Sequence, residues 1–356
     1  MEKWSCEKVK AWYAEKGRVT GCNFIPSDCI SGIEIWQEYG FDEKLKTIDR
    51  ELGLAENIGM TGVRMVMPYQ VWLLQHDGFM ERMERFLQVA DSHHITLMPV
   101  LFDDCCMPRP KKPVKVRFGP QPEPTPGCHG GFPATPFDGK AETGYILGDD
   151  RENWPDIERY VKDLVETFGR DERILLWDIW NEPGNSNRGS MSLELMTKAF
   201  GWAREMEQVQ PLTAGAWSFP DGWVNFGEND TIQEIEKAAL ELSDVISYHY
   251  YGDLERSKRV TEYMGRYGRP LFITEWLHRI FHNRVEELLP YFAAENISCY
   301  NWGLVAGKTQ TYEPWEVLRH VEGIDCSPWQ HDLFHADLTP YDEMEIEVFK
   351  RYQDTK

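Results

Sequence analysis

The sequence predicts an α/β protein of the (β/α)8 or TIM-barrel class, and two observations carry that prediction. Short runs of β-branched and aromatic residues alternate along the 356 residues with amphipathic stretches of helical period. Such alternation is typical of parallel strands joined by crossover helices. The pattern occurs eight times, which is the number of units that closes such a sheet into a barrel. A doubly wound open sheet is the alternative, but no Gly-rich phosphate-binding motif follows the first strand.

Each expected strand is a short apolar run bounded by polar or turn-forming residues. The eight strands are expected at residues 18–24, 61–67, 95–102, 174–180, 212–218, 245–251, 271–276 and 297–304. Helices are expected at residues 41–57, 78–93, 154–168, 192–210, 231–242, 254–267, 284–295 and 343–352. The first of these helices places four apolar residues on one face: Leu45, Ile48, Leu52 and Ala55. We therefore expect a single domain over residues 1–356, with its active site at the carboxyl ends of the strands.

One segment interrupts the alternation of strands and helices. Residues 103–151 contain nine of the 21 prolines, which remove amide donors and disfavour helix in the residue before them. This pattern predicts a long Pro-rich insertion after the third strand, on the catalytic face. We expect the insertion to form a wall that closes one end of the cleft, and a mobile surface loop is the alternative.

Composition and charge exclude some classes of partner. The chain has 38 Lys and Arg against 59 Asp and Glu, a net charge of −21, which disfavours nucleic acids and anionic membranes. No apolar run reaches the ~18 residues that a membrane span requires. The eight cysteines are irregularly spaced and residues 1–17 contain no hydrophobic segment typical of a secretory signal, so we expect reduced thiols and a cytoplasmic location. The sequence leaves the oligomeric state open.

Two strand ends carry carboxyl groups suited to catalysis. Residues 177–183 read Trp-Asp-Ile-Trp-Asn-Glu-Pro, so Glu182 follows an apolar strand directly. Apolar surroundings raise the pKa of a carboxyl group and suit it to donate a proton near neutral pH. Residues 271–276 read Leu-Phe-Ile-Thr-Glu-Trp and place Glu275 near the end of another buried strand. Hydrolysis of a glycosidic bond requires two such carboxyl groups facing one another, an acid and a nucleophile.

These motifs, on the fourth and seventh expected strands, resemble those of the clan of (β/α)8 retaining glycoside hydrolases. Within that clan the chain is similar to family 5, the cellulase-like enzymes, over nearly the whole barrel. The resemblance implies that Glu182 is the general acid/base and Glu275 the nucleophile. It also implies that Asn181 binds the 2-hydroxyl of the sugar. We expect no cofactor and no metal ion to take part.

Four further positions fit the same resemblance. His249 and Tyr251 look like the family's His-x-Tyr, whose Tyr hydrogen-bonds the nucleophile, and strand alternation puts both on one face. Arg64 is similar to an Arg that keeps the nucleophile ionised; an Arg inside an apolar strand is costly unless it is paired. A cation beside Glu275 would lower the pKa of that carboxyl group. Trp302 matches the aromatic floor under the reacting sugar, because aromatic faces pack against the apolar face of a pyranose.

The end of the third strand departs from the family. A His-containing run is usual there, but this chain places carboxylates at that point, and we expect Asp103 to bind a pair of sugar hydroxyls. A zinc site could in principle use six residues near the insertion: Asp103, Asp104, Cys105, Cys106, Cys128 and His129. Adjacent cysteines chelate one tetrahedral ion poorly and no Cys-x-x-Cys spacing occurs, so a reduced thiol pair is the simpler interpretation.

The function expected from these residues is that of a retaining β-glycosidase, which hydrolyses β-linked oligosaccharides by double displacement. This mechanism predicts two carboxyl groups ~5–5.5 Å apart. We expect exo action on short oligosaccharides. The alternatives are an endo-β-glycanase of the cellulase, xylanase or mannanase type, a transglycosylase, or a non-catalytic carbohydrate-binding barrel. A metal-dependent amidohydrolase is disfavoured, because the first strand offers no His-x-His.

Overall fold

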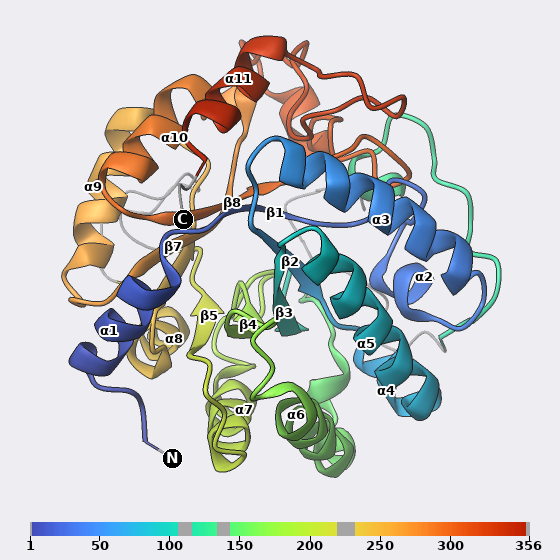
Figure 1. The fold of residues 1–356 in the computed structure, drawn as a ribbon, viewed down its shortest axis with the longest axis vertical. Helices are drawn as coiled ribbons and strands as arrows, with labels where there is room; N and C mark the ends of the chain where they lie inside the picture. Colours follow the sequence, from blue (N-terminus) through green and yellow to red (C-terminus); the bar gives the residue numbers. More distant parts are fainter. Residues whose placement is uncertain (1, 106–115, 134–142, 219–231, 354–356) are drawn as a thin grey trace.

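The computed structural model describes residues 2–105, 116–133, 143–218 and 232–353, and its eight strands form one parallel sheet (Figure 1). The strands are β1 (Thr20–Asn23), β2 (Gly62–Val66), β3 (Thr96–Asp103), β4 (Trp177–Asn181), β5 (Leu212–Gly215), β6 (Ile246–His249), β7 (Leu271–Trp276) and β8 (Ser298–Trp302). Their order is β5-β4-β3-β2-β1-β8-β7-β6. A parallel bridge between Ala216 and Tyr248 joins β5 to β6 and closes the ring. The predicted (β/α)8 barrel is confirmed.

The register of the sheet brings the expected site residues to one end of the barrel. Because neighbouring strands are parallel, residues near their carboxyl ends meet at the same rim. Three register pairs lie there: Asn23 with Arg64, Asp103 with Asn181, and His249 with Glu275. The motifs from distant parts of the sequence are therefore neighbours in space.

The outer helices follow the predicted pattern. Two of them, α3 (Phe41–Asn57) and α6 (Trp154–Phe168), begin and end where the sequence places them. The other expected helices are α5 (His76–Ser92), α7 (Leu193–Glu205), α8 (Glu234–Leu242), α9 (Leu254–Gly265), α10 (Val285–Ala294) and α11 (Glu343–Arg351). In α3 the side chains of Ile48, Leu52 and Ala55 are fully buried against the sheet, as their spacing predicts.

Three helices were not expected from the sequence: α1 (Cys6–Lys16), α2 (Gly32–Trp36) and α4 (Tyr69–Leu74). The helix α1 buries only Val9 and Tyr13, so no apolar stripe marks it, while α2 and α4 are too short to show a period. Val9 and Tyr13 belong to a separate apolar cluster that includes Phe272 near the amino end of β7. Through this cluster α1 covers the amino end of the barrel and leaves the carboxyl end for the site.

Two loops meet on the carboxyl face. The segment between β3 and α6 contains η1 (His129–Gly131), η2 (Leu147–Asp149) and η3 (Arg151–Asn153); the rest of the expected insertion at 106–115 and 134–142 lies outside the described residues. The loop between β8 and α11, not expected from the sequence, contains η5 (Glu316–His320). Gln310 of this second loop accepts a hydrogen bond from the Gly127 amide (2.8 Å) and donates one to the Thr125 carbonyl (2.7 Å). The two loops are thereby joined.

Buried ion pairs hold the loops to the barrel. Arg188, after β4, pairs with Asp104 at 2.9 Å, and both side chains are fully buried. Arg279, in η4 (Arg279–Phe281) after β7, pairs with Glu345 of α11 and donates to the His331 carbonyl at 2.7 Å. Removing one partner of such a pair leaves an uncompensated buried charge, which costs about 3–5 kcal/mol.

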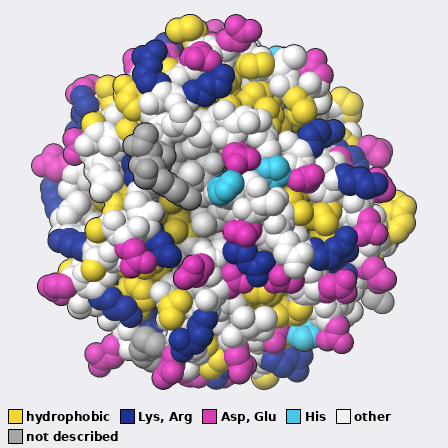
Figure 2. Space-filling model, viewed as in Figure 1, with side chains coloured by type: hydrophobic (Ala, Val, Ile, Leu, Met, Phe, Trp, Pro, Cys, Tyr) yellow, Lys and Arg dark blue, Asp and Glu magenta, His cyan; other side chains and the backbone are white. Residues whose placement is uncertain are grey.

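The outer surface mixes charges of both signs. Asp and Glu side chains are interspersed with Lys and Arg over the face in Figure 2, although acidic residues outnumber basic ones in the whole chain. No helix of the described ranges combines the length and the apolar character needed to cross a bilayer.

Packing of the outer helices makes a first testable prediction. Leu52→Ala removes a fully buried side chain from α3 and should lower the free energy of unfolding by about 2–5 kcal/mol. The matched control is Leu74→Ala, because Leu74 is 58% exposed and its truncation should cost less than about 1 kcal/mol. Urea unfolding of both variants measures the difference. Equal losses would contradict the packing of α3 described above.

Candidate active site

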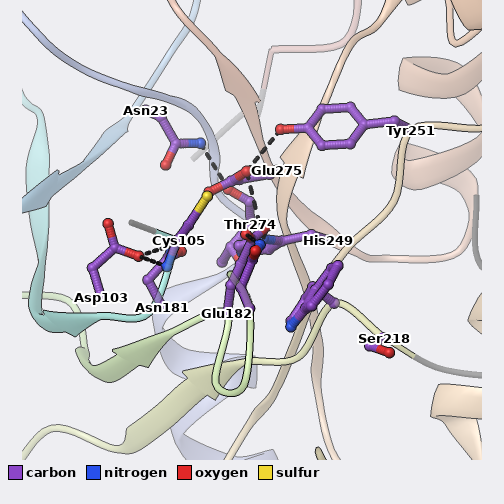
Figure 3. Close-up of polar contacts among 12 residues, drawn as sticks. Asn23, Asp103, Cys105, Asn181, Glu182, Ser218, His249, Tyr251, Thr274 and Glu275 are labelled. Atoms are coloured by element: carbon purple, nitrogen blue, oxygen red, sulfur yellow. Dashed lines mark hydrogen bonds and ion pairs between the residues drawn. The ribbon is translucent and has the colours of Figure 1, made fainter. Parts of the chain in front are cut away.

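Two buried carboxyl groups face each other at the carboxyl end of the barrel. Glu182 follows β4 directly and is 8% exposed, while Glu275 lies within β7 and is 7% exposed. One oxygen of each carboxyl group and one ring nitrogen of His249 all lie within 4.8 Å of one another. Figure 3 shows Glu182, His249 and Glu275 directed towards this common point. The sequence motifs of β4 and β7 thus converge on one centre.

Glu275 is held by a cation and a hydroxyl group. Its Oε1 lies 3.0 Å from Nη1 of Arg64, and its Oε2 accepts a hydrogen bond from the Tyr251 hydroxyl at 2.7 Å (Figure 3). Burial and the neighbouring Glu182 carboxylate raise the pKa of Glu275, whereas the Arg64 charge and the Tyr251 hydroxyl act in the opposite direction. The sequence analysis expected a lowered pKa here. Burial opposes that expectation, because the carboxyl group has lost most of its contact with water.

Glu182 is held by donors that carry no charge. Nδ1 of His249 donates to Oε1 at 2.8 Å, and Nδ2 of Asn185 donates to Oε2 at 2.5 Å. Burial lowers the pKa of His249 to about 3, so the imidazole is neutral and holds its proton on Nδ1. Burial also raises the pKa of Glu182, while hydrogen bonds from the Cys105 thiol and Asn185 lower it. Burial has the largest effect on this carboxyl group, so the pKa of Glu182 lies above its ordinary value.

Asn181 links the two carboxyl groups to the end of β3. Its Oδ1 accepts a hydrogen bond from Nη2 of Arg64 at 2.5 Å, and its Nδ2 donates to Oδ1 of Asp103 at 2.7 Å. The amide is therefore fixed in one orientation. Loss of water raises the pKa of Asp103 to about 7, and the charges of Glu182 and Glu275 act in the same direction. Binding of sugar hydroxyls by Asp103 stays a prediction.

Sequence reasoning missed two residues that orient Arg64. Asp178 is fully buried; its Oδ2 accepts a hydrogen bond from Nε of Arg64 at 2.9 Å and lies 2.8 Å from Nη2 of the same guanidinium. Asn23, at the end of β1, accepts from Nη1 of Arg64 at 2.7 Å and donates to the Thr274 carbonyl at 2.7 Å. Asp178 carried a usable signal, because a carboxylate and an Arg that are both inside apolar strands need each other. Asn23 carried none.

Trp302 lies where the sequence analysis expected it, at the carboxyl end of β8. In the register of the sheet it stands opposite Asn23, and its side chain is half-buried. It therefore occupies the same rim as the carboxyl groups. Its role as a floor for a sugar ring stays a prediction.

A group of histidines and aromatic rings packs against Tyr251. The Tyr251 ring lies 5.6 Å from each of three rings, those of His278, His331 and Trp315, and His129 lies 5.5 Å from His331. Burial lowers the pKa of all three histidines, to about 4 for His129, to about 3 for His278 and well below the ordinary value for His331. These histidines come from three different loops, so no local sequence pattern marks them.

The residues considered for a zinc site have other partners. Asp104 pairs with Arg188, and Nδ1 of His129 donates to the Glu313 carbonyl at 2.7 Å, while Cys106 lies outside the described residues. Within the ranges given above, one group of His, Cys, Asp and Glu side chains has ligating atoms close enough to share an ion. That group is Glu182, His249 and Glu275, the centre already described.

The fold matches those of known glycoside hydrolases, although no protein-family model and no curated protein matches the sequence. An endo-β-1,4-mannanase from Thermotoga petrophila aligns over 96% of this chain and 77% of its own, with a TM-score of 0.55 and 11% identity. GH5_18 from Streptomyces cattleya, solved in complex with GlcNAc, aligns over 96% of this chain and 82% of its own (TM-score 0.54, 13% identity). An exo-β-1,4-mannosidase from Opitutaceae bacterium strain TAV5 aligns over 95% of this chain and 61% of its own (TM-score 0.55, 15% identity).

At such low identity the comparison establishes the fold. The chain has the (β/α)8 fold of family 5 glycoside hydrolases, so the resemblance that the Asn-Glu-Pro and Thr-Glu-Trp motifs indicated is confirmed at that level. Exo- and endo-acting enzymes share this fold, so the fold by itself leaves the mode of action open.

The buried histidines predict a loss of stability in acid. In the unfolded chain a histidine binds a proton near pH 6.5. The pKa of about 3 for folded His278 means that the folded state binds fewer protons between these pH values. The free energy of unfolding must therefore fall as the pH drops from about 6.5 towards 3. Replacement His278→Phe should remove up to about 1.4 kcal/mol per pH unit of this decrease.

Urea unfolding at pH 7 and pH 4.5 measures this change. The phenyl ring keeps the stacking of residue 278 on Phe281, and neither ring nitrogen of His278 has a hydrogen-bond partner among the described residues. The matched control is His320→Phe, at a side chain that is 74% exposed. A pH dependence that weakens equally in both variants would contradict the assignment to the buried ring.

Proposed function

We propose that this protein is a retaining β-glycosidase that acts by double displacement. Glu275 attacks the anomeric carbon while Glu182 protonates the leaving oxygen, and Glu182 then removes a proton from the water that hydrolyses the glycosyl-enzyme. The observation that carries the proposal is the separation of the carboxyl groups, whose oxygens approach within 4.8 Å. An inverting enzyme needs about 6.5–9.5 Å, to leave room for a water molecule between the carboxyl groups.

The two sets of partners support the assignment of roles. Glu275 contacts a guanidinium and a hydroxyl donor, which stabilise the ionised form that a nucleophile needs. Glu182 contacts the neutral donors His249 and Asn185, and its pKa is raised by burial. A carboxyl group in that environment holds a proton more readily than one beside a cation. The same centre thus contains a group suited to donate a proton and a group suited to attack.

Residues around the carboxyl groups are proposed to bind the sugar. Asn181, fixed between Arg64 and Asp103, would contact the 2-hydroxyl, and Trp302 would lie under the ring. In its ionised form, Asp103 would accept hydrogen bonds from a pair of hydroxyls, because carboxylates are strong acceptors. A carbohydrate substrate agrees with a neighbour of the same fold that was solved with GlcNAc.

We propose exo action on short β-linked oligosaccharides. The contacts of Gln310 with Thr125 and Gly127 support it, because two loops joined in this way would close one side of the substrate site. The insertion at residues 103–151 would form part of this wall. An endo-β-glycanase is the alternative, since an endo-mannanase has the same fold. The cytoplasmic location and the single-domain organisation stay predictions.

Replacing the carboxyl groups tests the mechanism. On activated aryl β-glycosides, Glu275→Gln should lower kcat by about 10⁴-fold or more, because no other group can form the glycosyl-enzyme. Glu182→Ala should be partly rescued by azide, a nucleophile that needs no general base, with a β-glycosyl azide as product. The control Glu286→Gln changes a carboxyl side chain that is 51% exposed on α10 and should retain full activity. Persistence of turnover in Glu275→Gln would disprove the mechanism.

The pH profile tests the role of Tyr251. Its hydroxyl stabilises ionised Glu275, so Tyr251→Phe should raise the pKa of that carboxyl group. A nucleophile with a higher pKa becomes protonated at higher pH, and the acid side of the kcat/KM profile should move up by about one pH unit. Tyr248→Phe is the matched control, because Tyr248 lies in β6, three residues before Tyr251, and bonds Thr261 instead. An unmoved acid side in Tyr251→Phe would contradict the assignment of Glu275.

A further inference from the structure

An apolar cavity lies beside the catalytic centre. It has a volume of about 170 Å³ and sits between the carboxyl ends of β2 and β3 and the segment that precedes α6. Most of its wall is hydrocarbon, contributed mainly by Val66, Leu101, Phe102, Ile146, Leu147 and Ile157. Asp103 also lines it, so the cavity and the catalytic centre share one residue.

The walls of this cavity are held open by packing. Phe102 stacks on Trp180 at 4.8 Å between ring centroids and contacts Tyr160 edge-on at 5.8 Å. Tyr69, which also lines the cavity, stacks on Trp72 at 6.1 Å between ring centroids and also contacts Tyr160. Aromatic side chains that are fixed in this way cannot collapse into the space, so the cavity is preformed.

The chemistry of the lining selects an uncharged apolar ligand. Among the described residues that line the cavity, Tyr69 and Asp103 are the ones that can ionise, and no Lys, Arg or His is present to bind an anion. Burial raises the pKa of Tyr69 to about 12, so its hydroxyl stays neutral. Oδ1 of Asp103 already accepts hydrogen bonds from Asn181 and from the Cys105 amide. Val66 is 39% exposed at the rim, which leaves apolar surface ready for contact.

We propose that this cavity is a subsite for a hydrocarbon group carried by the glycoside, such as an alkyl chain. Asp103 lines the cavity and hydrogen-bonds Asn181, next to Glu182, so the cavity adjoins the site proposed for the sugar. A space of about 170 Å³ holds roughly five or six groups of the size of water, which corresponds to a chain of roughly five or six carbon atoms. This inference rests on the proposed glycosidase function and names the class of substrate.

A series of alkyl 1-thio-β-D-glucosides and 1-thio-β-D-mannosides tests the subsite, because the sulfur link resists hydrolysis. Calorimetry should show that Kd falls roughly fourfold for each methylene buried, until the chain reaches about five or six carbon atoms. Val66→Phe fills the rim and should raise the Kd of the hexyl thioglycoside at least tenfold while leaving that of the methyl thioglycoside unchanged. Leu147→Trp, which also fills the cavity, should likewise raise the Kd of the hexyl thioglycoside.

The matched control is Val209→Phe. Val209 is 47% exposed and precedes β5, at the amino end of the barrel, so its replacement should leave every Kd unchanged. A Kd that does not vary with chain length overturns the subsite, and so does a Val66→Phe variant that weakens the methyl and hexyl compounds equally. Activity on aryl glycosides with no chain-length effect would leave the glycosidase intact and refute the subsite. Tighter binding of longer chains without hydrolysis of any glycoside would support the subsite and refute the proposed glycosidase function.

Discussion

The arrangement of the catalytic centre depends on the buried guanidinium of Arg64. Its four partners come from three other strands: Asn23 of β1, Asp178 and Asn181 of β4, and Glu275 of β7. A buried cation is tolerated only when it is paired and its donors are satisfied. The requirement also works in the other direction, because Asp178 is fully buried and depends on Arg64 for its charge to be compensated. One ion-pair network therefore sets the relative positions of the strands that carry the site.

The balance of charge at this centre explains how a proton donor arises near neutral pH. Three carboxyl groups, Asp103, Glu182 and Glu275, share the environment of one cation, Arg64. Burial raises the pKa of each of them, and neighbouring carboxylates act in the same direction. Of the two proposed catalytic groups, Glu182 receives only neutral hydrogen bonds whereas Glu275 contacts the guanidinium, so Glu182 is the one better suited to donate a proton. The proposed roles of Glu182 and Glu275 thus follow from the position of the Arg64 guanidinium, which contacts the carboxyl group of Glu275 in β7 directly.

The two ends of the barrel are built differently. Helix α1 covers the amino end with an apolar cluster, whereas the carboxyl end is surrounded by loops that are tied together by hydrogen bonds and by neutral histidines. Two of these histidines, His278 and His331, pack on Tyr251, which in turn contacts Glu275, so the loops and the catalytic centre form one connected structure. The apolar cavity next to Asp103 adds a surface of different chemistry to the same rim.

Local patterns in the sequence determined the eight strands, most of the helices and the two strand-end carboxyl groups. Helices α3 and α6 agreed with prediction to the residue, because their apolar periods are long and regular. Helix α1, which buries only two side chains, and the loop after β8 lacked such a period and were missed.

Tertiary structure alone decided which side chains meet. Arg64 and Asp178 are 114 positions apart, and the three histidines beside Tyr251 come from separate loops. The physical reason is that helical and strand periods record only which face of an element is buried. The identity of a contact across the barrel depends on strand register and on loop packing, which no local pattern contains.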